Sequence, residues 1–190
     1  LFGPRQTVDG SGYYWNGTAD SYSWSAANAL KGGNSATIAA GGRLYLTDSA
    51  AHKTVHMDTT MALGSVYLYS NGYTLHVTAD NTIPANFVVG DSSYSLTKTG
   101  AAKLSMTSAQ AAKLAGIVVN DGTLKITDKV TGDTSNGDGG ISTLKIDKDF
   151  SGITGAGTLA VTLTGGSTYG SNNRSTIKLD SDFTGTLEVL

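Results

Sequence analysis

Four aspartates near the C-terminal end of the sequence have residue types and spacing that suit acid–base or metal chemistry. They are Asp147, Asp149, Asp180 and Asp182. They belong to two copies of one segment, STLKIDKDFSG beginning at Ser142 and STIKLDSDFTG beginning at Ser175. Alternate residues of a strand point to one face, so we expect the carboxylates to gather where the copies stack. Such a cluster would bind calcium through hard oxygen ligands, or divide into one protonated and one ionised carboxyl for hydrolysis.

The same acids also suit a purely solvated role at strand ends. Lys145, Lys148 and Lys178 stand beside them in the sequence and balance their charge. The Asp-Thr/Ser-Gly triplet of aspartic proteases is absent, since Asp48-Ser49-Ala50 and Asp133-Thr134-Ser135 both lack the glycine. The sequence therefore favours solvated strand ends. A paired-carboxylate hydrolase, either an aspartic-type protease or a glycosidase, is the alternative.

The histidines offer a second possible cluster. His52 and His56 are four positions apart, as in helical metal motifs, but the surrounding AHKTVHMDTT is rich in β-branched residues and favours a strand. On a strand they would share a face with Asp58, and His76 would lie on a neighbouring strand. The sequence thus favours exposed histidines. A His/Asp zinc site is the alternative. We predict no metal and no cofactor, and the absence of cysteine excludes disulfides and thiolate ligands.

Aromatic residues are concentrated near the N-terminus. Five of the 15 in the chain, Tyr13, Tyr14, Trp15, Tyr22 and Trp24, fall close together there. Such side chains form flat platforms against sugar rings, but they also cover the exposed end of a stack of repeats. The sequence favours the cap. If the platform interpretation holds instead, the ligand-binding residues are Tyr13, Tyr14, Trp15 and Trp24.

The elements that must position these residues are short strands. Apolar residues alternate with polar ones along the chain, which is the period of a β-strand, and many strands follow a glycine that supplies a turn. The pairs are Leu44 and Leu46, Val66 and Leu68, Leu75 and Val77, Leu104 and Met106, Leu124 and Ile126, Leu144 and Ile146, Leu159 and Val161, Ile177 and Leu179, and Leu187 and Val189. We predict an all-β fold, either a stacked β-solenoid (a parallel β-helix) or a β-sandwich.

Helical signals are few, so we expect at most one or two short helices. The stronger one is Ser108 to Gly116, where a serine cap precedes AQAAKLA and a glycine follows. A shorter signal covers Ser25 to Leu30, which fits either a short helix or only a turn.

Composition excludes two classes of partner. The formal net charge is -2 and the 13 basic residues are scattered, so no surface for a phosphate backbone is expected. No apolar stretch approaches the roughly 18 to 20 residues that span a bilayer, so we expect no membrane insertion by this segment.

One segment resembles a known repeat. Leu96 to Ile126 reads LTKTGAAKLSMTSAQAAKLAGIVVNDGTLKI, which is similar to the autotransporter-associated β-strand repeat, LTKTGAGTLTLSG followed after a variable stretch by VNAGTLxL. Tyr14-Trp15-Asn16-Gly17 with Trp24-Ser25 and Ala26-Ala27-Asn28 resembles the opening of such passengers, although Leu30 stands close to where a tryptophan is frequent. The resemblance implies a parallel β-solenoid at or beyond a Gram-negative cell surface, with no catalytic residues in the repeat itself.

These observations predict four regions and a function. The regions are an aromatic cap over 1–34, a first β-repeat stack over 35–131, an exposed Gly/Asp-rich loop over 132–140, and a pair of DxDF repeats over 141–190. The predicted function is a secreted or surface-exposed module, not an enzyme, that binds host or matrix glycoprotein or glycan. The alternative is a secreted hydrolase of glycoproteins such as mucin that uses the paired aspartates.

Overall fold

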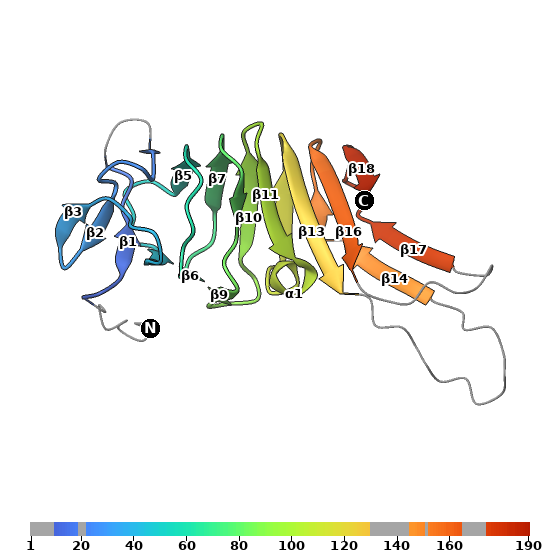
Figure 1. The fold of residues 1–190 in the computed structure, drawn as a ribbon, viewed down its shortest axis with the longest axis horizontal. Helices are drawn as coiled ribbons and strands as arrows, with labels where there is room; N and C mark the ends of the chain where they lie inside the picture. Colours follow the sequence, from blue (N-terminus) through green and yellow to red (C-terminus); the bar gives the residue numbers. More distant parts are fainter. Residues whose placement is uncertain (1–9, 19–21, 130–144, 151, 165–173) are drawn as a thin grey trace, which may run out of the picture.

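The chain folds into β-strands with one short helix (Figure 1). The computed structural model describes residues 10–18, 22–129, 145–150, 152–164 and 174–190. Sheet A contains, in order of hydrogen-bonded neighbours, β3 (Asn34–Ala36), β2 (Ala29–Lys31), β1 (Tyr13–Trp15), β4 (Arg43–Leu46), β6 (Ser65–Leu68) and β9 (Asn86–Val89). Sheet B contains β15 (Ile153–Thr154), β12 (Gly116–Val119), β10 (Ser95–Thr99), β7 (Tyr73–Val77) and β5 (Thr54–Met57). Sheet C contains β18 (Thr186–Val189), β16 (Thr158–Thr164), β13 (Thr123–Lys129), β11 (Lys103–Thr107) and β8 (Asn81–Thr82). The strands β14 (Lys145–Phe150) and β17 (Arg174–Leu179) form a separate pair.

Most strands pair in parallel, and from β4 onward consecutive strands of the chain go to different sheets. The chain passes from β4 in sheet A to β5 in sheet B, and from β10 in sheet B to β11 in sheet C. Within the described residues, the antiparallel pairs between named strands are β1 with β2 and β2 with β3, at the N-terminal end of sheet A. The all-β prediction with few helices is confirmed.

The buried side chains lie in columns that run across the sheets. Leu104, Leu124 and Leu159 are in register on β11, β13 and β16, and all three are buried. The other described strands bury their predicted alternate apolar residues in the same way, apart from β17, whose Leu179 is half-buried; this explains the period of two. β18 is a second exception: Leu187 and Val189 are 36% and 57% exposed, because β18 is the last strand of sheet C and no described strand covers it. Leu144 and the side chains of Ile146 and Ile177 lie outside the described residues, as does the predicted 132–140 loop.

The helix α1 (Ser108–Ala111) is shorter than predicted and is capped differently. Its N-cap is Thr107, whose hydroxyl accepts from the Gln110 backbone N–H while the Gln110 side chain accepts from the Thr107 N–H. This capping box makes Ser108 the first helical residue instead of the cap. The weaker signal from Ser25 to Leu30 is a turn and not a helix, since the chain turns at Trp24 and Ser25, and Ala29 and Leu30 belong to β2.

Glycines lie where one turn of the chain rests on the next. Gly100 and Gly122 have φ of +78° and +62°, and a Cβ on Gly122 would lie 2.4 Å from the Gly100 carbonyl oxygen. Gly122 precedes β13, as the glycine steps predicted. At these turns the backbones approach too closely for a side chain.

Lys98, on β10, points into the interior and is 1% exposed. Its ammonium donates to the carbonyl oxygens of Gly100 at 2.6 Å and Asp121 at 2.8 Å. Removal from water lowers the pKa of Lys98 to about 8, although the charges of Asp121 and Asp80 act in the opposite direction. Lys98 therefore joins two successive turns through backbone carbonyls.

Replacing Lys98 with methionine is expected to lower the free energy of unfolding at pH 7 by about 1 to 3 kcal/mol, because two buried carbonyls lose their donor. The pKa of Lys98 is lower in the folded state than its ordinary value of 10.5. The unfolded state thus holds the extra proton above pH 8, and this group makes wild-type stability rise with pH from about 8 towards 10.5. Urea unfolding at pH 7 and 9.5 should show that the difference in free energy of unfolding between wild type and Lys98→Met is larger at pH 9.5. An equal difference at the two pH values would contradict this account.

Candidate functional site

The two DxDF copies do not pair in the register that their matching sequences suggest. β14 and β17 pair with Lys145 opposite Arg174, so that Asp147 lies opposite Thr176 and Asp149 opposite Lys178. Matching the two sequence copies letter by letter would instead have placed Asp147 opposite Asp180. The observed pairing aligns Phe150, which is buried, with Leu179, which packs partly against the core. The observed register therefore agrees with the pairing of apolar residues and not with the alignment of the two sequence copies.

The acids that are described behave as turn residues. Asp180 is half-buried, and its carboxylate accepts from the backbone N–H of Asp182 at 2.9 Å, while the Asp182 side chain is exposed. The side chains of Asp147 and Asp149 lie outside the described residues. Within the described part of the chain, no group of three or more histidine or acidic side chains is placed to hold one metal ion. The solvated interpretation fits Asp180 and Asp182.

Three of the four predicted ligand-binding aromatics belong to the interior. Tyr13, Trp15 and Trp24 are buried. The indole N–H of Trp15 donates to the His52 carbonyl at 2.9 Å, and that of Trp24 donates to the Thr59 carbonyl at 3.0 Å. Because these rings are covered, they are not a surface platform for sugars. Tyr13 and Trp15 lie on β1, and the Trp24 backbone N–H donates to the His56 carbonyl of β5, a position that fits the cap interpretation favoured by the sequence.

The fourth, Tyr14, lies on the outer surface in a stack of tyrosines. Tyr14, Tyr45 and Tyr67 are in register on β1, β4 and β6. The ring centroids are 4.7 Å apart for Tyr14 and Tyr45 and 4.6 Å apart for Tyr45 and Tyr67, with interplanar angles of 10° and 9°. Tyr69 joins them, its ring centroid 5.9 Å from that of Tyr67. The spacing of these rings is the spacing of the strands themselves.

Other residues extend this surface, which we call the tyrosine face. Arg43 and Asn86 are exposed on β4 and β9, in register with Ser65 between them. The tyrosine face consists of Tyr14, Arg43, Tyr45, Tyr67, Tyr69 and Asn86. Glycines give the rings room: a Cβ on Gly12 would lie 2.3 Å from Cε2 of Tyr45, and one on Gly90 would lie 2.6 Å from Cδ1 of Tyr69.

Sequence reasoning missed Tyr45, Tyr67 and Tyr69. A signal was present, because Tyr45 and Tyr67 alternate with the apolar pairs Leu44 and Leu46, and Val66 and Leu68. Residues between inward-facing neighbours must face outward. Which outward residues become neighbours depends on strand pairing.

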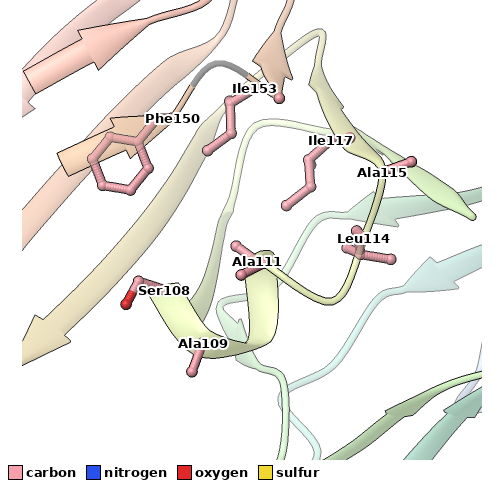
Figure 2. Close-up of a pocket in the computed structure, with 11 residues that line it drawn as sticks. Ser108, Ala109, Ala111, Leu114, Ala115, Ile117, Phe150 and Ile153 are labelled. Atoms are coloured by element: carbon pink, nitrogen blue, oxygen red, sulfur yellow. The ribbon is translucent and has the colours of Figure 1, made fainter. Parts of the chain in front are cut away.

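An open pocket of about 430 Å³ lies where α1 and the turn after it approach β14 and β15 (Figure 2). Phe150, Ile117 and Ile153 point towards α1, whose Ala111 faces them (Figure 2). Among the residues that the structure describes, the side chains of the lining are apolar apart from that of Ser108, and none is a carboxylate, histidine or lysine. These described residues can accept an apolar group and offer no side chain for acid–base catalysis.

Comparisons of the chain with protein-family models, with curated proteins and with solved structures gave no match. In the described part of the chain, no helix has the length and hydropathy needed to cross a bilayer.

Proposed function

We propose that this chain is a segment of a secreted or surface-exposed β-solenoid, of the autotransporter-passenger kind, that binds host or matrix glycoprotein through the tyrosine face. The order of strands supports the winding. From β4 onward, consecutive strands go to different sheets, and the pairs between strands of neighbouring turns are parallel, which favours a solenoid over a sandwich. The repeat-like segment Leu96–Ile126 covers most of β10, β11, α1, β12 and most of β13, and it includes two strands of sheet B and two of sheet C that pair with each other across one turn.

The tyrosine face is the observation that carries the binding proposal. Tyrosine and arginine are enriched where proteins bind partners, and tyrosine, serine, glycine and asparagine are typical of antibody binding loops. The parallel stacking and the close glycines restrict the rings before any ligand arrives, which lowers the entropy lost on binding. Because each ring covers the face of its neighbour, a ligand would meet ring edges and hydroxyl groups. Those groups suit the hydroxyls of glycans and the amides of peptides.

A hydrolytic function has no comparable support. Asp149 pairs across the strands with Lys178 rather than with a second acid. Among its described residues, the lining of the pocket beside α1 has no titratable side chain. We therefore give the binding function precedence over paired-aspartate hydrolysis.

The test is retention of the purified chain on immobilised mucin, glycans and matrix glycoproteins. The double variant Tyr45→Ala/Tyr67→Ala is expected to bind at least about tenfold more weakly than wild type, since truncating a central aromatic costs about 2 kcal/mol. Tyr45→Phe keeps the stacked ring and removes one hydroxyl, so it should lose less. The control is Thr97→Ala, on β10 in sheet B and away from the tyrosine face.

Two results would overturn the proposal. One is equal binding by wild type and the double variant, with circular dichroism showing that both are folded. The other is degradation of a glycoprotein by the purified chain with no retention on any surface.

A further inference from the structure

Two histidines lie side by side on the outer face of sheet B. His56 on β5 and His76 on β7 are in register on adjacent parallel strands. Their neighbours Val55, Met57, Leu75 and Val77 are buried, so both rings project outward. The ring centroids are 4.8 Å apart and the ring planes are tilted by 58°. Strand pairing thus brings together two imidazoles that are well separated along the chain.

Each ring is held by one threonine hydroxyl. Nε2 of His56 lies 2.9 Å from Oγ1 of Thr78, and Nδ1 of His76 lies 3.0 Å from Oγ1 of Thr99. Histidines that bind metals have this arrangement, in which one ring nitrogen is bonded to a protein group and the other faces the ion. The other ring nitrogens, Nδ1 of His56 and Nε2 of His76, are not used in these two hydrogen bonds.

We infer that His56 and His76 together bind one divalent transition-metal ion, with water in its remaining coordination positions. This inference is independent of the proposed function. Imidazole nitrogens coordinate Zn²⁺ at about 2.0 to 2.1 Å, and a pair of rings on adjacent strands brings two such nitrogens within reach of one ion after small side-chain rotations. With two neutral nitrogen ligands, Cu²⁺ should bind more tightly than Zn²⁺.

Nearby residues limit what else can contribute. Asp58, which follows His56 on the same outer side, has its carboxylate bonded to the backbone N–H and hydroxyl of Ser25. His52 lies apart from the pair, with its ring against Tyr22 at a centroid distance of 4.6 Å. The site therefore has two protein ligands, and it should bind metal reversibly.

The test is calorimetric titration of the full chain with CuCl2 and separately with ZnCl2, together with electron paramagnetic resonance of the Cu²⁺ complex. We expect one Cu²⁺ per chain and a spectrum of nitrogen coordination. His56→Ala and His76→Ala should each weaken Cu²⁺ binding at least tenfold, whereas the control His52→Ala should not. Thr99→Val should weaken it by about tenfold or more, the usual effect of losing a group that orients a ligand, and should leave the thermal midpoint without metal nearly unchanged.

Several outcomes would overturn the inference. They are the absence of saturable Cu²⁺ binding, equal binding by wild type and both histidine variants, and a loss with His52→Ala as large as with His56→Ala. Folding of each variant is checked by circular dichroism. A rise in thermal midpoint with Cu²⁺ is expected for wild type and for His52→Ala.

Discussion

Replacing Gly122 with alanine is expected to lower the free energy of unfolding by about 3 kcal/mol or more. The new methyl group would lie 2.4 Å from the Gly100 carbonyl oxygen and 2.7 Å from the carbonyl carbon of Ala101. Both are backbone atoms of the preceding turn, and they can retreat only if β11 and β13 move apart. The positive φ of Gly122 adds a strain of about 1 kcal/mol for a residue with a side chain.

Gly72→Ala is the matched control for this change. Gly72 has φ of +81°, but a Cβ there would have no atom within 4 Å. It therefore isolates the cost of the backbone conformation, about 1 kcal/mol. Urea unfolding of the two variants measures the difference, and equal losses of stability would show that the close approach of Gly122 to Gly100 carries no energetic weight.

Leu124→Ala is expected to have the second large effect, a loss of about 2 to 5 kcal/mol. Leu124 is fully buried and lies between Leu104 and Leu159 in one column. Truncating it leaves a cavity bounded by rigidly paired strands, which limits how far the surroundings can close in. The thermal midpoint and the urea midpoint should both fall.

Leu187→Ala provides the comparison at the end of the same column. Leu187 pairs with Leu159 but is 36% exposed, so its truncation removes less buried surface and should cost no more than about 1 kcal/mol. Equal losses in the free energy of unfolding for Leu124→Ala and Leu187→Ala would contradict the assignment of this leucine column to the hydrophobic core.

Alternation was enough to place most strands and their inward residues, because a strand has only two faces. It was not enough to distinguish Leu187 from Leu159. Both occupy the same place in a Gly-Thr-Leu step, and what differs is whether a further strand lies beyond. Whether a residue at the end of a stack is buried depends on the neighbouring strands, and a local sequence pattern carries no information about them.

The site was less predictable than the fold. The two DxDF copies indicated that corresponding residues would pair, which would place Phe150 opposite Phe183. β14 and β17 pair in another register, with Phe150 beside Leu179. Tyr45 and Tyr67 are distant in the sequence, and they become neighbours only because β4 and β6 pair in parallel. Such contacts arise from register, which the sequence specifies only through the summed preference of many weak contacts.

The two ends of this strand stack are unlike, and that asymmetry gives unfolding a direction. The antiparallel strands β2 and β3 and the buried indoles close one end, whereas β18 leaves apolar side chains in water at the other. In a structure held by nearest-neighbour contacts, disorder spreads inward from the weaker boundary. For these 190 residues taken by themselves, fraying should thus begin at β18 and proceed past β16. Because Tyr14, Tyr45 and Tyr67 lie at the closed end, they should keep their arrangement while the far end opens and recloses.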